Sequence, residues 1–532
     1  MKKFGLILII ISVFFISCAK RGTITGGPKD SIAPVIVKSN PKNYQTNFAG
    51  NKIKIDFSEY IKVKDINKQL IISPPMEKSP TIVPQGSASK FISITLNEDL
   101  KPNTTYSFNF GQSITDYNEG IPYSQFKYVF STGTFVDSLQ ISGNIKDAFD
   151  VKTDEFVTVM LYDAATYNDS LVYKKKPIYI TNTLEKNTAF KIENIKEGEY
   201  YLVALKDKNN NYNYQSKSEK IAFKKEKIKI PTDSTFTLKL FSEKNDIKTY
   251  SPTLESNNKL FLGYEGDVKN IQIYTKKNNI ETPLRFAKSE NRKSDTLQVF
   301  VPNDAKDSLN VIVKSDNYAK EYTVKLKKLK VADSLNITLF PNKKFNFDEK
   351  LSLVATTPVK KINSEKIFLR KKDSSSVPFK ITTDDFEQLI TFDFKQEENE
   401  KYIVELLPDA IEDIYDTQND SLKFEFTKGE LSDFGNLKLR LKNIKKFPYV
   451  LQILNSSGDI INEKYATKET EIYFEGIQPS NYQVRLFYDD NKNKIWDTGN
   501  FKTKTQPETM IYFPALIGVR ANWDVDQELE LD

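Results

Sequence analysis

The residues best suited to chemistry lie in an acidic loop near the C-terminus, residues 489–499 (DDNKNKIWDTG). Counted from Asp489, side chains that carry oxygen stand at the first, third, fifth and ninth positions, and a backbone carbonyl falls at the seventh. The residues at these positions are Asp489, Asn491, Asn493, Ile495 and Asp497. Because calcium needs several oxygen ligands that converge from one tight turn, the spacing predicts a weak structural calcium site.

This pattern resembles the front of a calcium loop of the EF-hand or dockerin type. It departs from that type twice, because Lys494 stands where glycine makes the sharp turn and Asn500 stands where a bidentate glutamate is expected. The alternative is an Asx-rich turn whose side chains hydrogen-bond their own backbone. A related loop at residues 207–213 has a single carboxylate, and there the turn is the favoured interpretation.

Three aromatic residues in or beside these loops are candidates for stacking on the sugar rings of a glycan. They are Tyr212, Tyr214 and Trp496. Core or edge packing of the same side chains is the favoured alternative, because aromatic residues bury large apolar areas in ordinary domains. Glycan binding therefore stays the second hypothesis for function.

The composition excludes most enzymatic chemistry. The 532 residues include no histidine and one cysteine, so catalytic triads, Cys-His dyads and imidazole or thiolate-cluster zinc sites are ruled out. Acidic doublets such as Asp384-Asp385 do not make a facing acid/base pair, since neighbouring residues on a strand point to opposite faces. A carboxylate-dependent hydrolase is the least favoured function, and no cofactor other than the candidate calcium is expected.

The N-terminus has the pattern of a lipidated protein. Two lysines precede the apolar run at residues 4–16, which is too short to span a bilayer and is typical of a signal peptide. The run leads into Phe-Ile-Ser-Cys, which ends at Cys18 and resembles the lipobox of bacterial lipoproteins, although phenylalanine replaces the usual leucine. We predict a signal peptide over residues 1–17, lipid on Cys18 and a tether over residues 18–30. An ordinary secretory signal is the alternative.

The charges give no support to nucleic-acid binding. The 77 basic and 71 acidic residues are interspersed and leave a formal net charge of +6 without a basic block. If Cys18 carries lipid, the mature chain has no free thiol, which suits an oxidising envelope compartment.

The elements that must position these residues are predicted to be strands. Residues 53–57 and 91–96 alternate apolar and polar side chains with the period of a strand. The stretches SNP, IKIDFSEYI, LKPNTTY, SITDYNEG and FKYVFSTG place residues 31–134 in one unit that resembles an SbsA-type bacterial Ig-like domain. The resemblance implies a β-sandwich that acts as a spacer or a binding module.

The remaining chain divides into further predicted sandwiches. The strand order of residues 139–243 is similar to that of transthyretin-like or carboxypeptidase-regulatory domains, which lack catalytic residues. Residues 192–207 align without a gap to residues 474–489, so a second transthyretin-like domain is predicted over residues 434–515.

Between these two units lie two more predicted domains. Residues 245–328 alternate and are rich in turns, and they are predicted to be Ig-like. Residues 402–429 repeat the pattern of residues 106–133, which predicts a second SbsA-like domain over residues 331–429. The acidic C-terminal tail, residues 516–532, alternates apolar and acidic residues near its end, so it either adds an edge strand here or on a partner, or is a frayed terminus.

The predicted fold class is therefore all-β, with tandem β-sandwich domains strung out as a rod behind a lipoprotein signal peptide. The whole chain resembles a Bacteroidota-type outer-membrane lipoprotein. That resemblance implies a non-enzymatic scaffold anchored in the outer membrane through Cys18, with other envelope proteins as partners, and an accessory role in outer-membrane protein assembly or secretion. In that group, acidic residues soon after the lipidated cysteine are linked to export to the cell surface. Here Lys20 and Arg21 follow Cys18 instead, so surface and periplasmic orientation both stay open.

Overall fold

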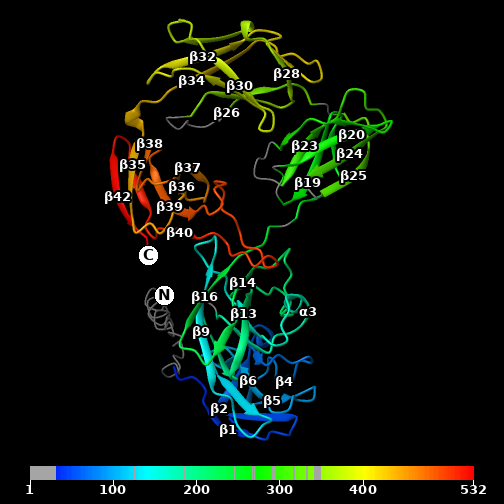
Figure 1. Ribbon diagram of the computed structural model, residues 1–532, viewed down its shortest axis with the longest axis vertical. Coiled ribbons are helices and arrows are strands. Elements are labelled where there is room, and N and C mark those ends of the chain that lie inside the picture. The colour runs from blue at the N-terminus through cyan, green and yellow to red at the C-terminus, as the bar shows by residue number, and fades with distance from the viewer. Residues whose placement is uncertain are drawn as a thin grey trace, which may run out of the picture.

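The protein is built almost entirely of strands (Figure 1). The computed structural model describes residues 31–531 except 125, 185, 245, 267, 269, 290–294, 316–317, 331–332 and 341–348. The predicted signal peptide, Cys18 and the tether lie outside the described residues. Helices in the described part are short, with α2 at Ile66–Gln69 and α3 at Leu171–Lys174, and none is long and apolar enough to cross a membrane. The prediction of an all-β chain of sandwiches is confirmed.

The first domain pairs two sheets around an aromatic core. One sheet contains β1 (Ile36–Asn40), β2 (Lys52–Val63), β4 (Thr81–Val83), β5 (Ser89–Thr95) and β7 (Ile114–Asp116), and the other contains β3 (Ile71–Ser73), β6 (Thr105–Asn109) and β8 (Lys127–Ser131). Alternate residues of β2, such as Ile53, Ile55 and Phe57, are buried because successive side chains of a strand point to opposite faces. They pack against the fully buried rings of Phe108 and Phe130.

The second domain has a large sheet and a small one. The large sheet contains β10 (Thr158–Asp163), β11 (Tyr179–Asn182), β13 (Gly198–Leu205), β14 (Ile221–Phe223) and β15 (Ile228–Ile230), and the small sheet contains β9 (Leu139–Asp147), β12 (Ala189–Ile195) and β16 (Thr235–Leu240). The final strand, β16, runs parallel to β9. Gly143 of β9 has no room for a side chain, because a Cβ there would lie 2.0 Å from the Phe236 carbonyl oxygen and 2.5 Å from the Phe190 ring.

The third and fourth domains are also sandwiches. The third contains β17 (Lys248–Thr249), β18 (Thr253–Ser256), β19 (Lys259–Glu265), β22 (Phe286–Lys288) and β23 (Thr296–Phe300), packed on β20 (Gln272–Lys277), β21 (Ile280–Pro283), β24 (Ser308–Ser315) and β25 (Tyr318–Lys325). The fourth contains β26 (Ile337–Phe340), β27 (Ser352–Ala355), β30 (Lys380–Asp384) and β31 (Leu389–Asp393), packed on β29 (Ile367–Lys371), β32 (Lys401–Leu406) and β34 (Leu422–Thr427), with the pair β28 (Val359–Ile362) and β33 (Ile411–Asp413).

The repeat between the first and fourth domains places one buried aspartate in each. Asp116 ends β7 and Asp413 ends β33, and both side chains are almost fully buried. The Asp116 carboxylate accepts the N–H of Gly120 at 3.4 Å, and the Asp413 carboxylate accepts the N–H of Thr417 at 2.9 Å. Each aspartate therefore holds the turn that follows its own short strand.

The fifth domain repeats the plan of the second. Its sheets are β35 (Gly435–Lys442), β38 (Glu471–Ile477) and β42 (Asp524–Glu530), and β36 (Tyr449–Leu454), β37 (Ile460–Ala466), β39 (Ser480–Tyr488), β40 (Met510–Tyr512) and β41 (Ile517–Val519). The strand β42 runs parallel to β35, as β16 does to β9. Arg440 pairs with Asp526 at 3.0 Å and Lys442 with Glu528 at 2.6 Å across the two strands. The edge strand expected as one alternative for residues 516–532 is therefore formed within the chain, and this segment completes the last sandwich instead of standing as a separate tail.

The domains do not form the extended rod that the sequence predicts. The fifth domain returns to the second, so the second to fifth domains make a closed circuit with the first domain at its lower end (Figure 1). Polar contacts join the first domain to the second, where Ile180 N–H donates to Ser73 Oγ at 3.1 Å, and the third to the fourth, where Tyr415 OH donates to the Asn258 carbonyl at 2.8 Å. The prediction of a rod was wrong because the sequence repeats define each sandwich but not the angle between neighbouring sandwiches.

Candidate functional site

The predicted calcium loop is folded as a hydrogen-bonded turn after β39. The buried Asp489 carboxylate accepts the backbone N–H groups of Asn493 at 3.0 Å and Lys494 at 2.8 Å. The amide oxygen of Asn491 accepts the N–H of Asn493 at 3.1 Å, and that of Asn493 accepts the N–H of Ile495 at 2.8 Å. These oxygens are therefore already acceptors within the loop, as in the predicted alternative of an Asx-rich turn.

Asp497 is held by the same network. The side-chain amides of Asn491 and Asn493 each donate to its Oδ2 at 2.6 Å, and Lys244 Nζ lies 3.3 Å from its Oδ1. Burial raises the pKa of Asp497, but these donors and the lysine charge outweigh it and hold the pKa below its ordinary value. The described residues contain no cluster of three or more acidic side chains suited to a metal ion. Calcium binding stays a prediction, and it requires the ion to displace these donors.

The loop at residues 207–213 has the same construction. The Asp207 carboxylate accepts the backbone N–H groups of Asn211 at 3.3 Å and Tyr212 at 2.7 Å. A buried glutamate closes the base of each loop, because Glu219 accepts the N–H of Lys208 and Glu508 accepts the N–H of Asp490. The two glutamates lie at different distances along the chain from their aspartates, so sequence alignment of the loops did not find them.

Of the three predicted sugar-stacking residues, Tyr214 is buried and Trp496 is partly buried, and both pack against neighbouring side chains. Tyr214 is 3% exposed and donates its hydroxyl to Glu243 at 2.9 Å. Burial, together with the Glu243 charge, raises the pKa of the Tyr214 hydroxyl far above its ordinary value. Trp496 donates its ring N–H to the Glu508 carbonyl at 3.0 Å, and its ring lies 4.8 Å from that of Phe149. Packing, the favoured alternative, therefore accounts for both side chains.

Trp496 begins a segment that joins the fifth domain to the second, residues 496–509, which we call the closing loop. Phe501, at its centre, is 1% exposed and belongs to the aromatic cluster of the second domain. Its ring centroid lies 5.3 Å from that of Phe223 and 6.3 Å from that of Tyr214. Gly499 precedes it against Phe241, where an added Cβ would lie 2.5 Å from the ring. The close fit requires glycine at this position.

Polar contacts surround this aromatic contact. Glu243 accepts the Phe501 N–H at 2.6 Å on one carboxylate oxygen and the Tyr214 hydroxyl on the other, so it bridges the two domains. Thr498 Oγ donates to the Ser242 carbonyl at 2.6 Å, and Lys504 lies 2.7 Å from Asp169. Because Glu243 is occupied in this way, it serves the contact between domains and is unsuited to act as a catalytic base.

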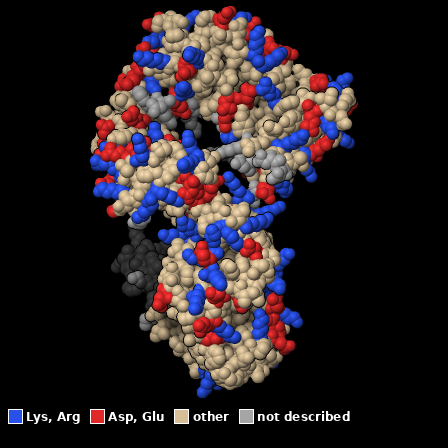
Figure 2. All heavy atoms as spheres, in the orientation of Figure 1, with Lys and Arg blue, Asp and Glu red and all other residues tan. Residues whose placement is uncertain are grey.

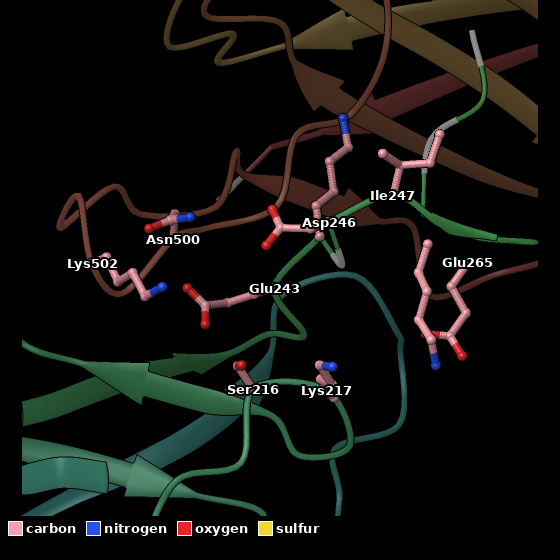
Figure 3. A pocket seen from close by; sticks show the side chains of 10 residues that line it. Ser216, Lys217, Glu243, Asp246, Ile247, Glu265, Asn500 and Lys502 are labelled. Atoms are coloured by element: carbon pink, nitrogen blue, oxygen red, sulfur yellow. The ribbon is translucent and has the colours of Figure 1, made fainter. Parts of the chain in front are cut away.

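Two cavities lie beside these elements. The first, of about 220 Å³, lies where the second, third and fifth domains meet, and Glu243 and Lys502 face each other across it (Figure 3). The second, of about 570 Å³, lies between the first two domains, with an apolar side that includes Leu70 and Pro80. Its polar side includes the third predicted sugar-stacking residue, Tyr212, which is partly exposed. Sequence reasoning missed this groove because its two sides come from different domains.

Comparison with known proteins identifies one domain. Residues 30–132 match the family model of a bacterial Ig-like domain. No curated protein matches the chain. Similar solved structures include the major pilin subunit BcpA of Bacillus cereus, with 9% identity, a TM-score of 0.15 and coverage of 74% of this chain and 99% of the pilin.

Two other solved structures have comparable values. The surface layer protein SbsC, domains 1–6, has 11% identity and a TM-score of 0.14 over 88% of this chain and 67% of its own. A fragment of alpha-2-macroglobulin from Escherichia coli has 11% identity and a TM-score of 0.15 over 56% of this chain and 98% of its own. Such low TM-scores carry no argument about function, so the family match alone identifies the first sandwich as similar to bacterial Ig-like domains.

Proposed function

We propose that the protein is a non-enzymatic, lipid-anchored scaffold of the outer membrane, an accessory subunit of an envelope machine that assembles or secretes outer-membrane proteins. The observation that carries this proposal is the closed circuit of the second to fifth domains, completed by the contacts of Thr498 and Phe501 with the second domain. A closed circuit fixes four sandwiches relative to one another, which suits a platform that several partners share.

The chemistry of the chain also favours binding over catalysis. The sequence lacks histidine, and the buried carboxylates of Asp489 and Glu243 are used by the turn and the domain contact. Charged side chains of both signs are interspersed over most of the visible face (Figure 2), which is typical of a hydrated protein surface and unlike the basic patch of a nucleic-acid-binding protein. The anchor rests on the position of Cys18 at the end of the apolar run.

A pull-down under gentle crosslinking tests the scaffold. An affinity tag inserted at Gly458, in the turn between β36 and β37, avoids packing because nothing lies within 4 Å of an added Cβ there. We expect outer-membrane proteins to be recovered with the chain in a fixed ratio, and that ratio to fall in Gly499→Ala, which disturbs the circuit. Gly50→Ala, where a Cβ makes only ordinary contact at 3.6 Å, is the matched control. Recovery of the chain alone would contradict the proposal.

Glycan binding is the second candidate, and the groove favours it. Tyr212 lines the groove beside Asn210, Asn211 and Asn213, which supply amide groups for sugar hydroxyls. Tyr212→Ala should release the protein from a polysaccharide gel that retards the parent chain, while Tyr473→Ala, on the outer face of β38, should not. Equal migration of the parent chain with and without polysaccharide would exclude this candidate.

A further inference from the structure

One face of the first domain exposes apolar side chains that the circuit does not use. Four of them lie on or directly beside the strands of the sheet that contains β1, β2, β5 and β7. We call this the N-terminal face and define it by Val35, Lys54, Tyr60, Lys90, Phe91 and Tyr117, all exposed. Scattered apolar residues are normal on a protein surface, but a gathered set marks a contact surface.

The register of the sheet shows that these residues are neighbours. Val35 exchanges hydrogen bonds with Ser58 of β2, and Tyr117 N–H donates to the Tyr60 carbonyl at 3.0 Å. Phe91 of β5 stands opposite Asp56 of β2. The exposed side chains therefore lie across adjacent strands of one sheet.

Lysines accompany the aromatic rings. Lys54 Nζ lies 4.6 Å from the centre of the Phe91 ring, and Lys90 Nζ lies 5.2 Å from that of the Tyr60 ring. Rings that lie at the level of lipid headgroups, with ammonium groups reaching the phosphates, are the usual composition of a protein surface that rests on a membrane. Lys54 also lies 3.1 Å from the Asp56 carboxylate, and the exposed rings together with the two lysines fit a surface of anionic lipid headgroups.

The course of the chain places this face near the predicted anchor. The described chain begins at Ser31, four residues before Val35, and the predicted lipid site at Cys18 precedes Ser31 by thirteen positions (31 − 18). Thirteen extended residues reach roughly 45 Å at most. The strands β1 and β2 also lie at the end of the molecule opposite the third and fourth domains (Figure 1), and that end shows few charged side chains (Figure 2).

We propose that the N-terminal face rests on the headgroups of the membrane that holds the lipid of Cys18, so that the circuit projects away from the bilayer. This proposal rests on the lipid anchor of the proposed function. It assigns the face to a lipid surface that contains anionic headgroups. The first domain would then set the orientation of the four other sandwiches relative to the membrane.

A single-cysteine probe tests the proposal on the full lipidated chain. Cys18 is the only cysteine and its sulfur would carry lipid, so Tyr60→Cys provides one site for an environment-sensitive fluorophore. Tyr473→Cys is the matched control, because Tyr473 is 49% exposed against 54% for Tyr60 and also has a lysine, Lys438, over its ring. The vesicles contain equal parts of phosphatidylethanolamine and phosphatidylglycerol.

We expect the Tyr60 probe to be protected from an aqueous quencher by about threefold or more on vesicles, with the Tyr473 probe unchanged. Lys54→Glu combined with Lys90→Glu should remove the protection while the protein still floats with vesicles. Flotation with equal quenching at both sites would overturn the proposal and leave the anchor standing. If the parent chain floats with vesicles no better than the Cys18→Ala variant does, both the lipid anchor and the membrane contact of the N-terminal face are refuted. Protection that appears only when another envelope protein is added would assign the face to that protein and overturn the proposal.

Discussion

The second and fifth domains share one plan, but only the fifth carries an insertion after its capped turn that enters the core of another domain. Both end a long strand, β13 or β39, with an aspartate that caps the following turn, and both close the base of that turn with a buried glutamate. In the second domain the chain then turns back to β14. In the fifth domain it continues into the closing loop before β40, and that extension carries Phe501 into the second domain.

The difference shows how a repeated fold gains a new contact without a new framework. The capped turn is the part that both copies keep, and it fixes the direction in which the loop leaves the sheet. The inserted residues supply a ring that fills the aromatic cluster and a glycine, Gly499, that lets the backbone approach Phe241. Stability of the turn and closure of the circuit can therefore be separated by mutation.

The largest expected effect comes from removing the inserted ring. Phe501→Ala should weaken the contact between domains by about 3–5 kcal/mol, the usual cost of deleting a buried phenylalanine. Small-angle X-ray scattering should show a larger radius of gyration, and zero-length carbodiimide crosslinking of Lys504 to Asp169, which lie 2.7 Å apart, should be lost. Phe447→Ala, at an exposed site of the same domain, is the control. An unchanged crosslink in Phe501→Ala would show that the ring does not hold the circuit closed.

Substitution of the two capping aspartates tests whether the turns of the second and fifth domains have different roles. Asp489→Ala and Asp207→Ala should each cost about 1–3 kcal/mol, because backbone N–H groups lose a buried acceptor. Hydrogen exchange should quicken in the loop of the altered domain in both cases. Only Asp489→Ala should also reduce the Lys504 crosslink, since the closing loop starts from its turn. Equal loss of the crosslink in both variants would contradict separate roles for the two turns.

Much of each sandwich is predictable from the sequence, because its signals are local. Alternation in residues 53–57 predicts a strand that the structure forms as part of β2. Alternation near the end of the chain predicts an edge strand as one of its alternatives, and the structure forms that strand as β42. Closure of the circuit is not predictable in this way. The burial of Phe501 depends on rings more than 250 positions away in the sequence, and the local alternation of polar and apolar residues does not predict contacts at that distance. For the same reason, the groove beside Tyr212 and the packing of Trp496 against Phe149 emerge only from the assembled domains.

The two loops should also differ in calcium binding, although the binding energy involved is small. Because the side-chain oxygens of Asp489, Asn491 and Asn493 already accept hydrogen bonds, we expect only weak binding, with a dissociation constant of about 10⁻⁴–10⁻³ M. Equilibrium dialysis with radioactive calcium should detect this binding in the parent chain and in Asp207→Ala, and should find it absent in Asp489→Ala. Micromolar affinity, or retention in Asp489→Ala, would place the ion elsewhere.

The smallest expected effect concerns the charge pair of Lys244 and Asp497. The lysine is 59% exposed and the aspartate 26%, so Lys244→Gln should cost only about 0–1 kcal/mol and less at high salt. The pKa of Asp497 is lowered in the folded chain, so its contribution to stability is complete above the ordinary carboxyl pKa of about 3.9 and is lost as pH falls through the folded value. Lys244→Gln should remove part of this acid dependence, whereas the amides of Asn491 and Asn493 keep the rest. Identical acid profiles for Lys244→Gln and the parent chain would assign the lowered pKa to the amides alone.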